Sequence, residues 1–179
     1  DVRDPHGQDL AAIINTLGLT SGEVSFSTQK LTTEKMSMLY NMTDCTICIS
    51  DAEGFGLSTL ESLSCGSPII VNMTGGLQEQ VTDGEQWFGI GIEPSSKAVI
   101  GSQEIPFIYE DRINKEDFLA ALTQIFEMTV EQRKELGLKG REHVLKNYGH
   151  EKFCRAWEEL LDETVESHGS WETRKGYKS

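Results

Sequence analysis

Along the first fifty residues, apolar positions alternate between the spacing of a helix and that of a strand. Apolar residues at i, i+3, i+4 and i+7 across positions 10–17, with Gly18 directly after them, predict an amphipathic helix that ends at the glycine. The run VSFS at 24–27 then predicts a short strand, Thr33 can cap a second helix, and CTICIS at 45–50 predicts a buried strand. This alternation favours parallel strands joined by helical crossovers.

The middle of the chain continues the same alternation. A helix that starts near position 57 and stops at Gly66 is followed by the strand-like run PIIVN at 68–72, a short helix at 77–81 and the strand-like run WFGIGIE at 87–93. The sequence therefore predicts the α/β fold class, with a parallel sheet and helices on both of its faces.

A loop and then helices are expected in the last half of the chain. Residues 94–113 carry two prolines and no helical period, so we expect a long surface loop there. Asn114 and Thr129 are placed to cap the two helices that follow. We expect one domain over 1–166 and a polar, poorly ordered tail over 167–179. The apolar stripes of the closing helices predict core faces; that of the last helix consists of Phe153, Trp157, Leu160 and Leu161.

Composition narrows the partners of this domain. With 16 Lys and Arg against 29 Asp and Glu, the 179-residue chain has a formal charge of −13, which argues against unaided binding to nucleic acid or an anionic membrane. No apolar stretch approaches the roughly 18 residues of a spanning helix and no signal segment opens the chain, so the default expectation is a soluble, cytoplasmic protein. Because the sequence starts only a few residues before a helix, we expect it to be a fragment of a longer protein. Peripheral attachment of that longer protein to a membrane is an alternative to a purely cytoplasmic location.

Cys45 and Cys48 are the one close pair among the four cysteines. Because positions three apart in a strand point to opposite faces, these two side chains are poorly placed to share a metal or a disulfide. We therefore expect buried structural thiols and no metal site here.

The candidate chemistry lies in the stretch 51–76, DAEGFGLSTLESLSCGSPIIVNMTGG, which sets Glu53 and Glu61 eight positions apart around a glycine-rich turn. Ligands of an open α/β sheet bind beyond the carboxyl ends of the strands, and this turn follows such an end. Glu61 falls in the second turn of the helix, where its carboxylate would lie toward the free amides of residues 56–59. Amides can hold a pyrophosphate and a carboxylate can hold a ribose diol, which together predict a nucleotide.

Glu53 is placed differently, in the loop before the helix. Gly54 and Gly56 let the backbone pass close to a ligand there, so Glu53 can reach a hydroxyl-rich group beyond the pyrophosphate, namely a sugar. Gly75 and Gly76 form a second close-approach loop on the same rim. Taken singly, each carboxylate has an ordinary alternative as a solvated surface group, but their placement together with the glycines favours a site.

The segment EGFGLSTLESLSCGSPIIV, with the Gly-Gly pair after it, resembles the signature of retaining GT-B glycosyltransferases of the glycosyltransferase family 4 type. The family's E-x7-E pattern falls on Glu53 and Glu61, its GFGL turn on 54–57 and its GG-x-x-E on 75–79. The order of elements is also similar to the C-terminal half of the GT-B fold, a Rossmann-like parallel sheet that binds the nucleotide sugar.

The resemblance implies a UDP-, GDP- or ADP-sugar donor and transfer of the sugar, with retention, to a carbohydrate or lipid-linked acceptor. It implies neither a metal nor a further cofactor. Residues 1–166 would be the donor domain, without its first strand or strands and without the N-terminal acceptor domain. Glu53 would be the catalytic residue, close to the anomeric carbon. The implied donor-binding residues are Glu61, Gly54, Phe55, Gly56, Leu57, Gly75 and Gly76.

Two family features have no match in the sequence. The Arg and Lys that usually hold the diphosphate are missing, and none of His6, His143, His150 and His168 fits the family pattern. We expect these histidines at the surface or at helix caps. Without the acceptor domain, the isolated chain is expected to bind donor weakly and not to turn over.

Three other functions remain open. A nucleotide-sugar epimerase shares the two-domain architecture, and product analysis on the intact protein separates it from a transferase. A phosphoacceptor receiver domain fits Asp51 at a strand end, although an acidic pair beside a first strand is missing. A degenerate domain that only mediates interactions is the third, and the intact Glu53 and Glu61 speak against it.

Overall fold

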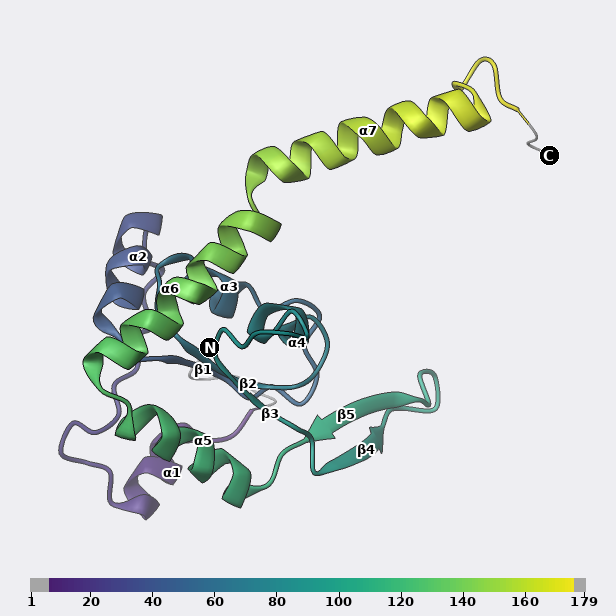
Figure 1. Ribbon diagram of the computed structural model, residues 1–179. Coiled ribbons are helices and arrows are strands. Elements are labelled where there is room, and N and C mark those ends of the chain that lie inside the picture. Colours follow the sequence, from purple (N-terminus) through teal and green to yellow (C-terminus); the bar gives the residue numbers. More distant parts are fainter. Residues whose placement is uncertain (1–6, 176–179) are drawn as a thin grey trace. The chain divides into compact units, whose positions relative to one another are not determined.

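The computed structural model describes residues 7–175, in which two compact units divide between Met36 and Ser37. After α1, helices and strands alternate from α2 to β3, and a hairpin and three helices follow (Figure 1). In chain order the elements are α1 Leu10–Leu17, α2 Thr33–Met42, β1 Thr46–Cys48, α3 Leu57–Ser64, β2 Ile69–Asn72, α4 Leu77–Val81, β3 Ile90–Ile92, β4 Ser96–Ile100, β5 Ile108–Arg112, α5 Lys115–Glu127, α6 Val130–Asn147 and α7 His150–His168.

The central sheet has three parallel strands in the order β1-β2-β3. Ile70 of β2 pairs with Ile47 of β1 on one side and with Ile90 of β3 on the other. Parallel pairing requires the crossover helices that the sequence predicted, and α3 and α4 are those crossovers. The strands are shorter than the predicted apolar runs, but their order and type agree with the prediction.

Helices cover both faces of the sheet. Every residue of β2 is buried, and its side chains alternate between the two faces. Ile69 and Val71 pack with Leu63 of α3, whereas Ile70 packs with Ile125 of α5. Figure 1 shows α5 on the side of the sheet opposite α3 and α4. The predicted α/β fold with a parallel sheet and helices on both faces is therefore confirmed.

The first unit contains α1 and a run without regular structure. The Asp9 side chain accepts from the Ala12 amide at 3.0 Å, and Gly18 ends α1 with φ 72°. The predicted strand at 24–27 is wrong, because no strand forms there. Alternation alone does not make a strand, since the backbone groups need a neighbouring strand to bond.

Residues 94–113 are not the irregular loop expected from the sequence. They contain a two-stranded antiparallel hairpin in which β4 and β5 pair in register from Ser96 with Arg112 to Ile100 with Ile108. The prolines lie outside the paired residues, where their missing N–H groups cost no ladder bond.

The closing helices have the predicted caps at two of their starts. The Asn114 side chain accepts from the Asp117 amide at 2.7 Å, and Thr129 forms a capping box with Gln132. For α2 the cap is Thr32 instead of the predicted Thr33, since the Lys35 amide donates to the Thr32 hydroxyl.

The helix α7 has no buried residue, so the prediction that its apolar stripe is core is wrong. The side chains of that stripe, Phe153, Trp157, Leu160 and Leu161, are all exposed.

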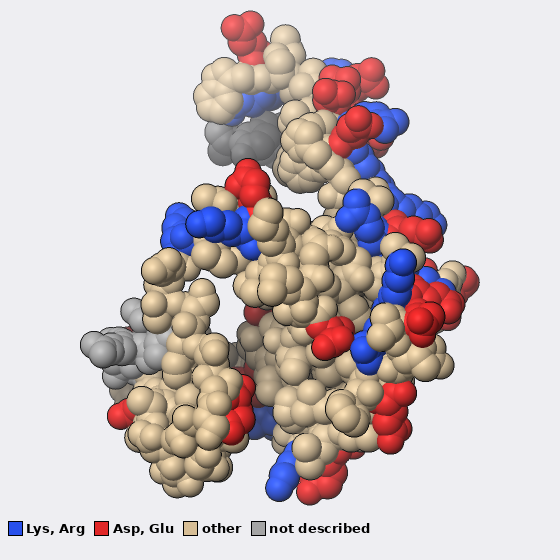
Figure 2. All heavy atoms as spheres, turned by 90° about the vertical axis from the view of Figure 1, so that its left-hand side faces the viewer, with Lys and Arg blue, Asp and Glu red and all other residues tan. Residues whose placement is uncertain are grey.

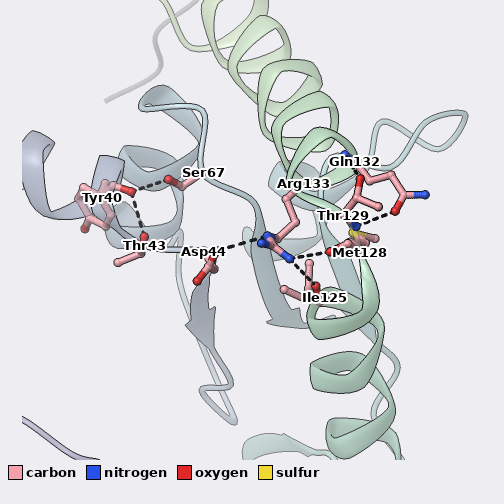
Figure 3. Close-up of polar contacts among 9 residues, drawn as sticks. All are labelled: Tyr40, Thr43, Asp44, Ser67, Ile125, Met128, Thr129, Gln132 and Arg133. Carbon is pink, nitrogen blue, oxygen red and sulfur yellow. Dashed lines mark hydrogen bonds and ion pairs between the residues drawn. The ribbon is translucent and has the colours of Figure 1, made fainter.

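Arg133 of α6 binds both the residue before β1, Asp44, and the turn between α5 and α6 (Figure 3). Its guanidinium lies 3.3 Å from the Asp44 carboxylate, just before β1, and donates to the Met128 carbonyl at 2.6 Å. The carbonyl of Tyr40 in α2 accepts in turn from the hydroxyls of Thr43 and Ser67. Within the second unit, these bonds hold the last part of α2 to the loop after α3 and hold α6 to the residue before β1.

Cys45 and Cys48 lie on opposite faces of the sheet, as predicted, but both are only partly buried. All four cysteines are free thiols, and Cys48 packs on the side of the sheet that faces α3 while Cys45 packs on the side that faces α5. Burial raises the pKa of the Cys45 thiol above its usual value, which disfavours the reactive thiolate.

Charges of both signs lie on the face of the molecule drawn in Figure 2. On that face, Lys and Arg side chains are interleaved with Asp and Glu. None of the helices among residues 7–175 is long and apolar enough to cross a membrane.

Candidate site at the glycine loops

Two glycine loops meet where β1 and β2 end. The Gly76 amide donates to the Gly54 carbonyl at 3.2 Å, so the loop after β2 lies against the loop after β1. A Cβ placed on Gly75, whose φ is 50°, would lie 1.7 Å from the Glu53 carbonyl oxygen. Only glycine fits so close an approach. The structure thus brings Glu53, Gly54, Gly75 and Gly76 together, as the sequence predicted.

A buried glutamine, Gln80, forms hydrogen bonds that stabilise the turn before α3. Gly56 has φ 86°, and a Cβ there would lie 2.5 Å from the Leu77 side chain. The fully buried Gln80 of α4 donates to the carbonyls of Phe55 and Gly56 and accepts from the Thr59 hydroxyl at 2.7 Å. Gln80 is a site residue that the sequence did not reveal, because its partners meet it only when α4 packs on the turn.

Two exposed backbone amides at the start of α3 are available to a ligand. The N–H groups of Leu57 and Ser58 have no acceptor among the described residues, and Gly56 at the N-cap has no side chain to supply one, whereas the next residue, Thr59, is fully buried. The partial positive charge of a helix N-terminus is therefore uncompensated at this turn. Leu57 itself is exposed, and Phe55 is partly so.

Glu61 lies on the exposed side of α3, one turn beyond those amides. One of its carboxylate oxygens accepts from the Tyr40 hydroxyl at 3.0 Å, which orients the side chain and leaves acceptor positions on the carboxylate open. Burial, followed by the bond to Glu61, raises the pKa of Tyr40 to about 12, so the hydroxyl stays a donor at neutral pH. Sequence reasoning missed Tyr40, which comes from the separate helix α2.

Glu53 differs from Glu61 in having no fixed partner. It lies in the loop after β1 and is half-buried, and among the described residues no hydrogen bond or ion pair to its carboxylate is formed. A carboxylate that is held near the sheet edge without a partner is free to bind a ligand.

The β4–β5 hairpin reaches the same edge through Asp111. The Asp111 amide donates to the Asp51 carbonyl at 2.7 Å, and the Asp111 carboxylate accepts from the Thr74 hydroxyl at 2.9 Å. The Asn72 side chain donates to the Asp111 carbonyl at 2.6 Å. The bond from Thr74 and the nearby Lys97 ammonium lower the pKa of the Asp111 carboxyl. Sequence reasoning placed nothing from 94–113 at the site, and Asp51 here anchors the hairpin through its backbone.

The histidine prediction is wrong at one position. His143 of α6 is buried, stacks on Phe88 with ring centroids 4.2 Å apart, and bonds the Glu79 carbonyl at 2.9 Å. The Tyr148 ring bridges from His143 to Phe55 of the glycine turn, with centroids 5.7 Å and 5.8 Å away. His150 and His168 are exposed as expected, while His6 lies outside the described residues.

Metal ligands were not expected at this site. Within residues 7–175, no group of three or more His, Cys, Asp or Glu side chains is arranged to hold a metal ion.

Comparison with known proteins identifies a family. The model of the family "Glycosyl transferases group 1" matches residues 16–143, well over half of the chain. The chain is 39% identical over 62 residues to a D-inositol 3-phosphate glycosyltransferase from Thermomonospora curvata, and 40% identical over 52 residues to one from Acidothermus cellulolyticus. Those stretches are 34% and 29% of this chain but only 14% and 12% of the two relatives.

The fold also has a counterpart among solved structures. Sucrose-phosphate synthase from Thermosynechococcus elongatus matches with a TM-score of 0.67 and 22% sequence identity, over 92% of this chain and 37% of that chain. At this identity the likeness is one of fold, and it agrees with the expected GT-B type of α/β domain. Together with the family match, which includes both glycine loops, it establishes the relationship: the chain belongs to the group 1 glycosyl transferases.

Proposed function

We propose that this chain binds the nucleotide-sugar donor of a retaining, metal-independent glycosyltransferase of the family 4 type. The meeting of the two glycine loops is the observation that carries the proposal. At one edge of a parallel sheet it brings together glycine backbone without side chains, amides without hydrogen-bond acceptors and two carboxylates. The natural protein has a further, acceptor-binding domain and works in the cytoplasm, and the 179-residue chain alone binds donor without turnover.

The diphosphate is the part of the donor that suits the start of α3. The exposed amides of Leu57 and Ser58 lack acceptors, and phosphate oxygens supply them. In a chain of net charge −13, binding an anion depends on such local donors. Backbone dipoles that are already oriented also stabilise the charge that develops on the leaving diphosphate. Gly75 and Gly76 let the donor lie directly on the backbone.

The two carboxylates have separate roles in this proposal. Tyr40 occupies one oxygen of Glu61, and the remaining acceptor positions bind the ribose diol. Glu53, with no partner of its own among the described residues, accepts hydrogen bonds from the transferred sugar near its anomeric carbon. Glu61 therefore fixes the nucleotide, and Glu53 acts on the sugar.

The transfer step needs one bond to break and one to form on the same face of the sugar. The bond between the anomeric carbon and the diphosphate oxygen breaks, and the acceptor hydroxyl oxygen bonds to that carbon. The acceptor's proton passes to the departing diphosphate, so charge and atoms balance without a metal. The glycine turn contributes by holding the diphosphate in position for that transfer.

Calorimetric titration of the chain with UDP, GDP and ADP, and with their sugars, tests the proposal. Hydrogen bonds to a charged group contribute about 1.5–3 kcal/mol, so Glu61→Ala should weaken binding of the preferred nucleotide roughly tenfold or more. Glu158→Ala is the matched control, because Glu158 is an exposed helical glutamate on α7. Equal affinity of wild type and Glu61→Ala would contradict the ribose assignment.

A further inference from the structure

The β4–β5 hairpin has two chemically different faces. Residues opposite each other in an antiparallel pair share a face, and alternate residues lie on opposite faces. Lys97 pairs with Asp111 and Val99 with Tyr109, so these four side chains share one face, which we call the Tyr109 face. The other face carries Ser96 opposite Arg112, Ala98 opposite Glu110 and Ile100 opposite Ile108, and none of these six paired residues is aromatic.

The Tyr109 face is anchored at the candidate donor site. Its Asp111 carboxylate accepts from the Thr74 hydroxyl, directly before Gly75, and its Asp111 amide bonds the Asp51 carbonyl. Both partners belong to the two loops that carry the predicted donor residues. The face therefore begins at the rim of that site and extends away from it along the hairpin, which Figure 1 shows projecting beyond the end of β3.

The chemistry of the face combines an aromatic ring with fixed polar groups. The Tyr109 side chain is 53% exposed and Val99 is 59% exposed. The Lys97 ammonium lies 5.9 Å from the centroid of the Tyr109 ring and 3.3 Å from the Asp111 carboxylate. A ring surface bordered by a donor and an acceptor suits a ligand that has an apolar face and a rim of hydroxyls, which describes a sugar ring.

The size of the face also suits a sugar better than a protein. Five paired residues extend about 17 Å at roughly 3.3 Å each, and two strands span about 10 Å, so the face covers on the order of 170 Å². A stable protein interface buries about 800 Å² on each partner. One or two sugar rings fill the smaller area.

We propose that the Tyr109 face is a subsite for a carbohydrate acceptor. A sugar ring of the acceptor stacks on Tyr109, and Asp111 and Lys97 bond its hydroxyls. The subsite lies on the donor-binding chain itself, adjacent to the loop that holds Glu53. This inference rests on the proposed function, because it needs a donor at the neighbouring loops to give the acceptor its role.

Amide chemical shifts of the isotopically labelled chain provide the test. The probes are methyl glycosides of glucose, galactose and mannose together with cellobiose, added separately and again in the presence of UDP, GDP or ADP. We expect the sugars to shift amides of β4 and β5. Tyr109→Ala should weaken this binding about five- to tenfold, in line with the contribution of an aromatic contact. Tyr109→Phe should bind like wild type.

Two controls separate the inference from its alternatives. Ile108→Ala, on the other face, should leave sugar binding unchanged, and intact β4–β5 amide signals in Tyr109→Ala exclude loss of the hairpin. If nucleotides shift the amides of Leu57 and Ser58 while none of the sugars shifts the hairpin, the subsite is refuted. Hairpin shifts that follow protein concentration alone refute it in favour of a second copy of the chain. Sugar binding without nucleotide binding supports a glycoside site and overturns the proposed function instead.

Discussion

Gly75→Ala is the sharpest perturbation of the junction between the two glycine loops. The added methyl carbon would lie 1.7 Å from the Glu53 carbonyl oxygen and 2.9 Å from the carbonyl carbon of the same residue. Both atoms belong to the backbone, so no flexible side chain can move aside. The φ of 50° at this position adds the strain that any residue with a Cβ meets in the left-handed region.

The expected loss of stability has two parts. A left-handed conformation costs a non-glycine residue about 1–2 kcal/mol. Forcing the loops apart to admit the methyl group adds about 1–3 kcal/mol, as for other overpacked sites. We therefore expect Gly75→Ala to lower the free energy of unfolding by about 2–5 kcal/mol.

Gly84→Ala is the matched control for the conformational part. Gly84 has φ 91°, but a Cβ there meets nothing within 4 Å, so only the backbone strain applies. Urea unfolding followed by circular dichroism should rank the chains as wild type, Gly84→Ala and then Gly75→Ala, with at least 1 kcal/mol between the two variants. If Gly75→Ala costs no more than Gly84→Ala, the close contact between the loops is refuted.

Two further predictions concern the core and the support of Glu61. Leu63 of α3 is fully buried against β2, so Leu63→Ala should lower the free energy of unfolding by about 2–5 kcal/mol. Leu57→Ala, at an exposed position of the same helix, should change the free energy of unfolding in urea by less than about 0.5 kcal/mol. Folding raises the pKa of Tyr40 from 10.0 to about 12. The stability that this raised pKa contributes to the folded state is therefore complete below pH 10 and is lost as the pH rises toward 12. Urea midpoints across that window should fall less steeply in Tyr40→Phe than in wild type; parallel slopes would contradict the role of Tyr40.

The glycine turn was predictable because its signals are local. A buried strand, two turn glycines and a helix that stops at Gly66 follow one another in the sequence, and each constrains the backbone directly. The same holds for the caps at Asn114 and Thr129, whose partners lie three residues away. Predictions that depend on neighbours in sequence were therefore confirmed for most of the second unit.

Features that depend on distant partners were missed. The run at 24–27 alternates like a strand, yet no strand pairs with it among the described residues. The hairpin at 94–113 carries no recognised turn signal, and Asp111 is recognised as a site neighbour only through its bond to Thr74. Periodicity identified the apolar stripe of α7 but contains no information about what covers it.

Buried polar residues were the other failure of sequence reasoning. His143 was expected at the surface or at a helix cap, because most such side chains are solvated, and Gln80 was not singled out in the sequence. In the structure both are buried and fully engaged, Gln80 beneath the glycine turn and His143 against Phe88 and the Glu79 carbonyl. Burial of such groups is tolerated because partners satisfy them, and several of those partners are far away in the sequence: Gln80 bonds the Phe55 and Gly56 carbonyls and His143 bonds the Glu79 carbonyl.

The central claim is that the glycine loops bind the diphosphate of a sugar nucleotide. Amide chemical shifts of the labelled chain, recorded while UDP, GDP and ADP are added, test it most directly. The account predicts that at least one nucleotide shifts the amides of Leu57, Ser58, Gly75 and Gly76 together, and that the same residues shift less in Glu61→Ala. Saturable shifts confined to any other part of the chain, or none with all three nucleotides, would contradict it.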